Sequence, residues 1–342
     1  MNRIYAILAS AIALTSCGRT VTMVTTTADR TWDLQEVSPL NNQEVSAVLT
    51  VDLNDRKQTI QGFGTAFSEM SYEALSHLSE QDREDIYREL FAPGVGANFT
   101  INRTPLGAND FSLKYYSYDE VDGDFGMEHF SIENDRSTLI PSIKAALAQN
   151  PDLKIWASPW CPPAWMKTNK HYATRPMRSM RRAIDAAAPR PGGAPGQGNG
   201  SMGQQALNAM KTRDMSNVIT DNGITPEQTG NEGMMMFTPD EKYFKAYALY
   251  FQKYIRAYRE EGIDIFMVMP QNEPNSAQWY PSCVWTADGL RQFMRHLGPA
   301  MEEVGVEVMH GTMERADWKQ ADTVLSDPVA GPYIKGVAFQ WG

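Results

Sequence analysis

The sequence contains little cysteine and little histidine, and their spacing excludes the common zinc modules. Its 342 residues include three cysteines and five histidines. No two cysteines form a CxxC pair and no two histidines form an HxxxH pair, which excludes zinc fingers and zincin-type metalloproteases. We therefore expect neither a metal nor a cofactor.

The sequence also lacks an excess of positive charge. Lysine and arginine total 31 against 41 aspartates and glutamates, for a formal net charge of −10. A nucleic acid or an anionic membrane held by surface charge is therefore not expected as a partner, whereas neutral or cationic ligands stay open. With 42% hydrophobic and 21% charged residues, the composition is that of a globular protein.

The apolar run at the start of the chain is too short to span a bilayer. It extends from Ile4 to Leu14, whereas a spanning helix needs roughly 20 residues. The run follows Arg3 and precedes Thr15-Ser16-Cys17, which is typical of an export signal and resembles the lipobox of bacterial lipoproteins. We predict a lipoprotein signal peptide at 1–16, a lipid anchor at Cys17 and a tether over 17–30. The protein would then be exported and held at a membrane, periplasmic or on the cell surface, through the lipid alone. An ordinary secretory signal is the alternative.

Two cysteines remain once Cys17 is assigned to the anchor. An oxidising compartment permits a disulfide between Cys161 and Cys283. Two buried, unpaired thiols are an equally open interpretation.

Short apolar runs alternate with longer amphipathic segments from residue 60 onward, which predicts βα units and a parallel sheet. We expect strands at 59–67, 98–104, 154–158, 265–270, 307–311 and 336–340. We expect helices at 72–90, 135–149, 239–261, 287–304 and 318–325. A strand at 44–53 precedes this pattern, so 31–56 is assigned to a side β-sheet and 57–342 to the barrel. Residues 170–232 form a long loop with a Gly- and Pro-rich centre.

The helix at 239–261 has a clear start signal. Thr238 is expected to cap it, with Pro239 in the first position and Glu241 completing a capping box. Aromatic residues at helical spacing predict a core-facing side, namely Phe244, Tyr247, Phe251, Tyr254 and Tyr258.

The residues capable of chemistry follow the predicted strands, where parallel βα barrels build their active sites. Asn272-Glu273-Pro274 follows the fourth strand, and a glutamate desolvated there can hold a proton near neutral pH, as a general acid must. Arg103 and Asp110 follow the second strand and suit sugar hydroxyls. The tripeptide Asn-Glu-Pro is by itself a weak indicator of a catalytic site. Its position directly after the fourth strand makes that interpretation stronger.

Aromatic residues are dense in two of these loops, as Trp160, Trp165, Trp279, Tyr280 and Trp285. Exposed indole rings need something to pack against, and the C–H faces of sugars suit them. Plugging the top of the barrel is the alternative. We prefer sugar binding for Trp160 and packing for Trp156 and Trp318.

The chain resembles glycoside hydrolase family 30, a group of (β/α)8 retaining glycosidases related to glucosylceramidases. The matching stretches run in order from about Lys57 to the end of the chain: Gln61-Gly62-Phe63-Gly64, Ala66-Phe67-Ser68, Arg103, Pro105-Leu106, Asp110-Phe111-Ser112, Tyr118, Ala157-Ser158-Pro159-Trp160, Trp165 to Asn169, Gln271 to Pro274, Tyr280-Pro281 and Asp327 to Trp341.

The resemblance implies a TIM barrel and specific roles. Glu273 matches the acid/base carboxylate and Asn272 the partner of the sugar 2-hydroxyl, while Arg103, Asp110 and Trp160 match residues lining the non-reducing sugar subsite. Gln340 and Trp341 replace the His-Trp that glucosylceramidases tend to have in the pocket. Phe-Gln-Trp-Gly is similar to the β-1,6-glucanase branch, which favours β-1,6-glucan as substrate over a glucolipid or a simple β-glucoside.

The sequence departs from the family pattern at its end. Retaining hydrolysis needs a second carboxylate about 5 Å away, and the family's nucleophile lies on the seventh strand, whereas the expected strands stop at the sixth. Glu314 follows the fifth strand and is expected to be a pocket-wall or surface residue. We therefore expect a C-terminally truncated barrel that lacks the last part of its side β-sandwich and is inactive alone. A non-catalytic glycan-binding lipoprotein is the alternative of another class.

Overall fold

The chain divides into two compact units, residues 1–59 and 60–342, which are described separately. The computed structural model describes residues 21–30, 32–37, 52, 54–177 and 221–341. In these ranges, no helix has the length and apolar character needed to cross a membrane.

The first unit contains an antiparallel pair of strands, β1 (Val21–Thr25) and β2 (Asp33–Val37), with Val21 opposite Val37. β1 lies within residues 17–30, which were expected to form a tether, although its two Val and two Thr residues are β-branched and suit a strand. Most of the strand expected at 44–53, like the signal peptide and Cys17, lies outside the described residues.

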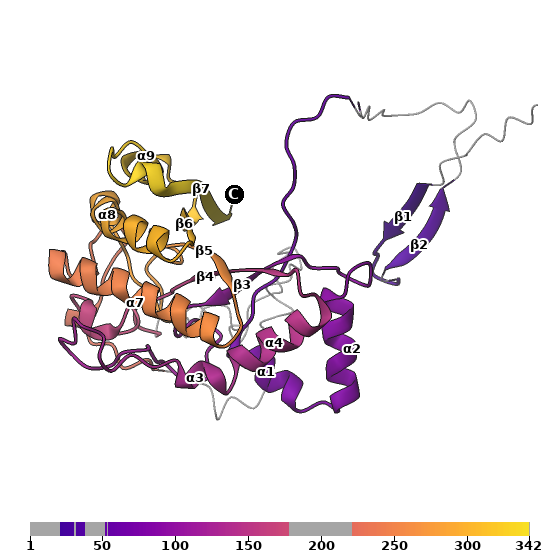
Figure 1. Cartoon of the computed structure of the whole chain (residues 1–342), viewed down its shortest axis with the longest axis horizontal. Helices are drawn as coiled ribbons and strands as arrows, with labels where there is room; N and C mark the ends of the chain where they lie inside the picture. Colours follow the sequence, from indigo (N-terminus) through magenta and orange to yellow (C-terminus); the bar gives the residue numbers. More distant parts are fainter. Residues whose placement is uncertain (1–20, 31, 38–51, 53, 178–220, 342) are drawn as a thin grey trace, which may run out of the picture. The chain divides into compact units, whose positions relative to one another are not determined.

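The second unit is built on a parallel sheet in the order β3-β4-β5-β6-β7 (Figure 1). The strands are β3 (Ile101–Pro105), β4 (Lys154–Ser158), β5 (Ile265–Val268), β6 (Glu307–Arg315) and β7 (Ile334–Trp341). Five of the six expected strands are therefore confirmed. Sequential, parallel strands with helices between them are the arrangement of a (β/α) barrel.

The strand expected at 59–67 is wrong as a full strand. Only one parallel bridge forms, between Ala66 and Arg103, although Phe63 and Thr65 also accept backbone hydrogen bonds from the β3 side. The close approach explains Gly64, because a Cβ there would lie 1.4 Å from the carbonyl oxygen of Ile101.

The helices lie outside the strands (Figure 1). They are α1 (Glu69–Ser76), α2 (Glu80–Phe91), α3 (Glu133–Arg136), α4 (Leu139–Gln149), α7 (Glu241–Glu260), α8 (Ala287–Glu303) and α9 (Trp318–Leu325), with short 3-10 turns η1 (Ala164–Met166), η2 (Pro226–Gln228) and η3 (Gly331–Tyr333).

Three helix predictions need correction. The single helix expected at 135–149 is α3 followed by α4, with a break at Ser137 and Thr138. The single helix expected at 72–90 is two helices, because the Ser79 side chain accepts a hydrogen bond from the Asp82 N–H and so starts α2. Helix α7 is capped by Asp240, which accepts from the Lys242 N–H, and not by Thr238. Asp240 is the N-cap because its short carboxylate reaches a free backbone N–H in the first turn of the helix.

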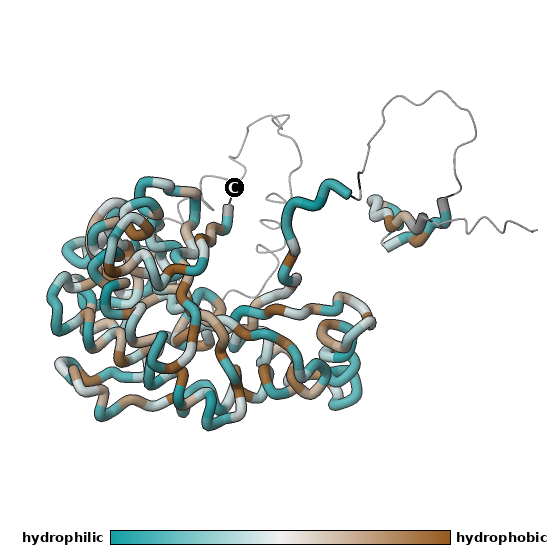
Figure 2. Tube along the Cα trace, turned by 45° about the horizontal axis from the view of Figure 1, so that its top comes forward, coloured by the Kyte–Doolittle hydropathy of each residue, from teal (hydrophilic) through white to brown (hydrophobic). Residues whose placement is uncertain are grey.

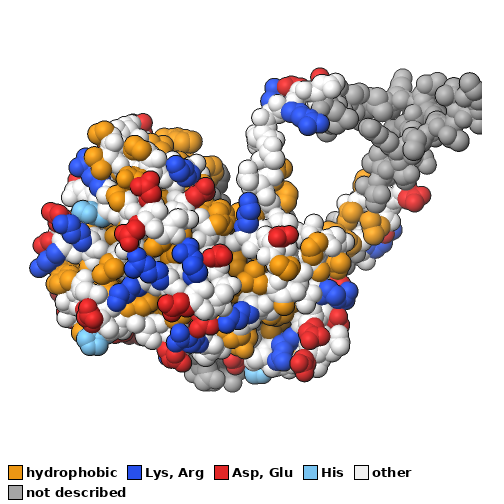
Figure 3. Space-filling model, viewed as in Figure 1, with side chains coloured by type: hydrophobic (Ala, Val, Ile, Leu, Met, Phe, Trp, Pro, Cys, Tyr) orange, Lys and Arg blue, Asp and Glu red, His pale blue; other side chains and the backbone are white. Residues whose placement is uncertain are grey.

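The predicted aromatic side of α7 is confirmed as core. Phe244, Tyr247, Phe251, Tyr254 and Tyr258 are all buried. Apolar stretches occupy the interior of this unit (Figure 2), and charged side chains of both signs are interspersed on the face seen in Figure 3.

Two buried charged side chains hold the loops of this unit together. The Lys167 ammonium, with no exposed side chain, donates to the carbonyl oxygens of His171, Tyr172, Ala173 and Ser282. It thereby joins the loop after β4 to the loop after β5. The Asp135 carboxylate accepts from three tyrosine hydroxyls, those of Tyr116, Tyr118 and Tyr258, at 2.6–2.7 Å.

Candidate active site

A cleft of about 380 Å³ opens at the carboxyl ends of the strands. Four of the five strands supply a part of it: Arg103 comes from β3, Trp160 from the loop after β4, Asn272 and Glu273 from the loop after β5, and Gln340 from β7. The remaining lining residues are Ala66, Phe67, Ser68, Ser71, Asn109, Asp110 and Phe111. The structure therefore brings together six of the seven site residues predicted in the barrel. The backbone of the seventh, Trp341, pairs with Arg315 at the end of β7, and its side chain lies outside the described part.

Glu273 is held in a fixed and mostly buried position. The residue is only 7% exposed, and its Oε2 accepts a hydrogen bond of 2.8 Å from the Tyr280 hydroxyl. Its backbone N–H donates to the Thr312 carbonyl at 2.7 Å, and its φ of 50° is uncommon for a residue other than glycine. Such outliers cluster at functional sites.

The protonation of Glu273 is set by opposing effects. Burial raises the pKa of its carboxyl, and the Tyr280 hydrogen bond, which stabilises the carboxylate, opposes that rise. The nearby charges of Asp110 and Glu314 raise the pKa as well, while Arg103 lowers it. The net result is a carboxyl group that holds its proton to higher pH than an exposed glutamate.

Arg103 organises the floor of the cleft. Its guanidinium donates to the Ser158 hydroxyl at 2.6 Å and to Asn272 Oδ1 at 2.7 Å. It also lies 4.0 Å from the ring centroid of Trp160 and 4.9 Å from that of Trp156. Loss of solvent lowers the pKa of Arg103 to about 9, against the opposing effect of Asp110 and Glu273, so the group stays charged at neutral pH.

Asp110 lines the same cleft and has one carboxylate oxygen without a hydrogen-bond partner among the described residues. This oxygen, Oδ1, is buried. Burial raises the pKa of this carboxyl. An unpartnered carboxylate oxygen on a cleft wall is suited to accept from a ligand hydroxyl.

The predicted aromatic residues divide between cleft and core. Trp165 and Trp285 are buried among other rings, Trp285 lying 4.6 Å from Phe237, so they pack and do not face the cleft. Trp160 does line the cleft. The packing role expected for Trp318 is wrong, because this first residue of α9 is 67% exposed.

Three residues that were not among the predicted site residues support the site, although Tyr280 had been singled out as one of the loop aromatics. Tyr280 bonds Glu273, Ser158 accepts from Arg103, and Thr312 bonds Asn272 through its hydroxyl at 3.1 Å. Ser158 and Tyr280 stand in stretches that match the family, but the sequence did not indicate their hydrogen-bond partners, and Thr312 had no signal beyond a hydroxyl near a strand end.

Cys161 and Cys283 are both free and buried, so the disulfide left open by the sequence does not form. Burial raises the pKa of both thiols, which makes them poor nucleophiles.

Glu314 lies at the edge of the site without lining the cleft. Its N–H donates to Asn275 Oδ1, and its Oε2 lies 2.7 Å from Arg315 Nη1. It is half-buried at the edge of the site, outside the cleft wall, and its charge contributes to the raised pKa of Glu273.

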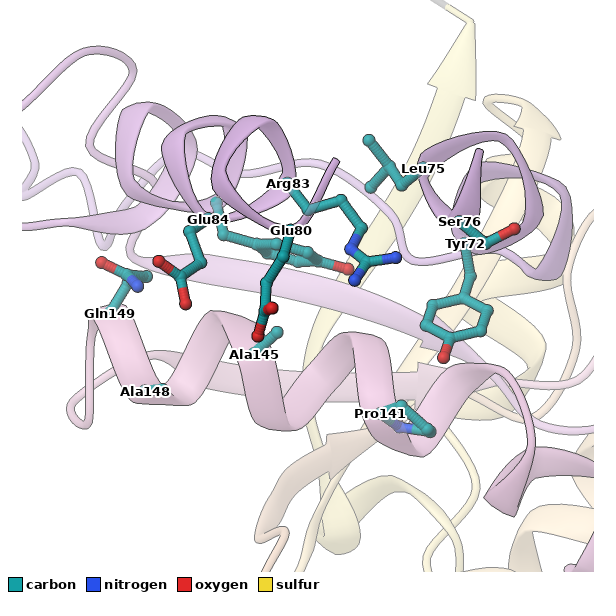
Figure 4. Close-up of a pocket in the computed structure, with 11 residues that line it drawn as sticks. Tyr72, Leu75, Ser76, Glu80, Arg83, Glu84, Pro141, Ala145, Ala148 and Gln149 are labelled. Carbon is teal, nitrogen blue, oxygen red and sulfur yellow. The ribbon is translucent and has the colours of Figure 1, made fainter. Parts of the chain in front are cut away.

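A second groove, of about 350 Å³, lies on the outer layer between α1, α2 and α4 (Figure 4). Glu80 and Glu84 of α2 extend toward α4, where Ala145 and Ala148 lie, and Arg83 extends toward α1. The groove contains none of the candidate site residues.

The family profile described as the glycosyl hydrolase family 30 TIM-barrel domain matches residues 60–180 and 222–342, which include every strand of the sheet and the whole lining of the cleft. The chain belongs to this family. Members with curated names include the endo-1,6-beta-D-glucanase neg1 of Aspergillus fumigatus, 30% identical over 304 residues that cover 85% of this chain and 51% of the relative. The lysosomal acid glucosylceramidase of Mus musculus is 26% identical over 311 residues, which cover 88% and 49%.

Solved structures agree on the family 30 fold. The endo-beta1,6-glucanase BT3312 has a TM-score of 0.64 at 24% identity, covering 93% of this chain and 59% of that one. SrfJ from Salmonella typhimurium has a TM-score of 0.65 at 23% identity, covering 91% and 57%. The chain spans about half the length of the curated relatives it matches.

Proposed function

We propose that the whole protein is a retaining β-glycoside hydrolase that acts on β-linked glucan, β-1,6-glucan in particular, with Glu273 as its acid/base. The observation that carries this proposal is the buried Glu273 carboxyl, bonded to Tyr280 beside the Arg103 and Asn272 floor of the cleft. A carboxyl protonated near neutral pH can protonate a leaving glycosidic oxygen and then, as a carboxylate, activate water.

The cleft supports a neutral polyhydroxylated ligand. Asp110 Oδ1 offers an acceptor, Asn272 an amide donor, and Trp160 and the 55% exposed Phe111 offer apolar surface. Burying a hydroxyl without such partners is costly, so paired polar groups favour a sugar over an apolar ligand. Family members named as endo-1,6-glucanases support the β-1,6 linkage, and glucosylceramidase relatives support a glucolipid or β-glucoside as the second candidate.

Leaving-group dependence in the whole protein tests the role of Glu273. Glu273→Gln should lower hydrolysis of β-1,6-glucan about 10²- to 10⁴-fold and that of an aryl glycoside with a good leaving group far less. Glu314→Gln is the matched control, since it removes a carboxylate near the cleft but outside its lining. An equal loss on both substrates would contradict the acid/base role.

Measuring which sugars the chain binds distinguishes a glucan site from a glucolipid site. Together with an activity assay of the whole protein, it also tests whether the protein only binds glycans. Calorimetry should show that gentiotriose, a β-1,6-linked glucose trimer, binds more tightly than an alkyl β-glucoside. Tight binding together with no hydrolysis by the whole protein would favour the glycan-binding alternative.

We also propose that the protein is exported and anchored through a lipid on Cys17. The support is the sequence of 1–17 alone. Fatty-acid labelling in a bacterial host should mark the wild-type protein and not Cys17→Ser, with Cys161→Ser as control. Labelling of Cys17→Ser would disprove the anchor.

A further inference from the structure

Three donors converge on one side-chain oxygen at the floor of the cleft. Asn272 Oδ1 accepts from Arg103 Nη2 at 2.7 Å, from Thr312 Oγ1 at 3.1 Å and from Gln340 Nε2. A carbonyl oxygen has two lone pairs, so three donors leave it no capacity for a ligand.

Arginine decides which atom of the Asn272 amide faces this cluster. The two ends of an amide look alike in shape, and their assignment depends on the hydrogen bonds around them. A guanidinium can only donate. The atom 2.7 Å from Arg103 Nη2 is therefore the oxygen of Asn272, and the Gln340 atom that faces it must be the nitrogen.

The remaining contacts are consistent with this orientation. Gln340 Nε2 has a second hydrogen, which it donates to Thr312 Oγ1 at 3.0 Å. The Thr312 hydroxyl then has its own hydrogen free for Asn272 Oδ1 at 3.1 Å. Each hydrogen that Gln340 Nε2 and Thr312 Oγ1 donate within the cluster therefore has its own acceptor.

We propose that Gln340 and Thr312 are positioning residues that, with Arg103, lock the Asn272 amide so that its Nδ2 alone faces the cleft. Gln340 thus acts through Asn272, in contrast to the direct substrate contact predicted from the sequence. Asn272 Nδ2 makes no hydrogen bond to another described residue, so both its hydrogens are available.

The lock has a consequence for the ligand, and this part rests on the proposed function. A site that presents only an N–H requires an acceptor at that point of the ligand. A freely rotating asparagine would accept or donate equally well. The locked amide therefore hydrogen-bonds the sugar hydroxyl at that point through the oxygen lone pair and not through the hydroxyl hydrogen.

Nitrogen NMR of the free 342-residue chain tests the lock without any ligand. With ¹⁵N-labelled asparagine, the Asn272 side-chain signal is the one lost in Asn272→Asp and in Asn272→Ser. Hydrogen bonds to an amide oxygen deshield its nitrogen, so Thr312→Val and Gln340→Met should each move this signal upfield. Thr312→Ser, which keeps the hydroxyl, should leave it in place.

A general loss of structure would not give this pattern. Thr323→Val on α9, whose hydroxyl bonds the Lys319 carbonyl, is the control for a threonine outside the cluster and should leave the signal unmoved. The lock is disproved if Thr312→Val and Thr312→Ser give the same Asn272 side-chain signal and Gln340→Met leaves that signal at its wild-type position.

Calorimetry then tests the selection with gentiobiose and its monodeoxy and monodeoxyfluoro analogues, because fluorine accepts a hydrogen bond but cannot donate one. At one ring position the deoxy sugar should bind about tenfold more weakly than the parent, with the fluoro sugar between them. That difference should shrink in Gln340→Met. If gentiobiose does not bind at all, the proposed function fails while the NMR result on the lock stands. If it binds with no such position, the selection is wrong.

Discussion

At the scale of single residues, the chemistry of the cleft depends on how Glu273 is surrounded. Burial favours the neutral carboxyl, and the Tyr280 hydroxyl at 2.8 Å favours the carboxylate. An acid/base must pass between both forms in one reaction cycle. The balance between desolvation and one hydrogen bond therefore sets the pH at which the group works.

Removing the Tyr280 hydroxyl should disturb this balance in a known direction. Tyr280→Phe takes away the hydrogen bond that stabilises the carboxylate, so the pKa of Glu273 should rise above its already raised value. A ¹³C titration of the Glu273 carboxyl in this chain measures the change, and Tyr333→Phe, remote on η3, is the control. A fall in the pKa would show that the hydroxyl does not stabilise the charged form.

At the scale of elements, close backbone contacts and inter-helix ion pairs position the strands and helices behind the cleft. The segment before α1 reaches β3 only because Gly64 has no Cβ, as the Ile101 carbonyl occupies that space. Helix α8 is joined to the turn after α9 by Asp327, whose side chain is 2% exposed and bonds Arg291 and Arg295.

Gly64→Ala should displace the segment that carries Ala66 and Phe67 into the cleft wall. Overpacking typically costs about 1–3 kcal/mol, and a clash with backbone puts this site at the upper end or beyond. Urea unfolding gives the free energy. Gly126→Ala is the control, because its Cβ would meet side chains and no backbone, Glu128 at 3.2 Å and Asp124 at 3.8 Å. Equal stability of the two variants would contradict the close approach.

Asp327→Asn should loosen the joint between α8 and α9. The change removes the charge that pairs with two arginines and costs about 1–3 kcal/mol, whereas Asp288→Asn, at a side chain 61% exposed, should cost less than about 1 kcal/mol. The arginines hold the pKa of Asp327 below its usual range. Its contribution is therefore present above the ordinary pKa of an aspartate and is lost as the pH falls. Urea unfolding at pH 7 and at pH 3 measures both effects.

At the scale of the whole molecule, the pH dependence of stability should reflect Asp135. Burial raises its pKa to about 6, against three tyrosine hydrogen bonds that lower it. A raised pKa means that the contribution to stability is full below about pH 4, where an unfolded aspartate is also protonated, and is lost as the pH rises through about 6.

Asp135→Asn should remove this dependence. Between pH 4 and pH 7 the wild-type chain should lose up to about 3 kcal/mol relative to the variant, which keeps an acceptor oxygen but cannot ionise. Urea unfolding at several pH values gives the difference, with the exposed Asp152→Asn as control. A constant difference across this range would show that Asp135 does not titrate in it.

Particular residues and elements show which parts of the fold could be predicted from the sequence and which could not. Periodicity placed β4 and α9 at their observed bounds, because short apolar runs and amphipathic stretches are local properties. It failed for Trp318 and for the single helix at 72–90, since burial depends on distant neighbours and a serine cap competes with helix continuation. Glu273, Asn272 and Arg103 were predicted together because parallel strands bring their carboxyl ends to one edge.

The sequence by itself determined the family, the order of strands and helices and the residues at the strand ends. Only the tertiary structure decided that Tyr280 bonds Glu273, that Cys161 and Cys283 stay unpaired, and that Gln340 donates to Asn272. The physical reason is the distance along the chain over which each effect acts. Propensity and periodicity act over a few residues, whereas hydrogen-bond partners such as Asn272 and Gln340 are separated by 68 positions and meet only when the sheet has formed.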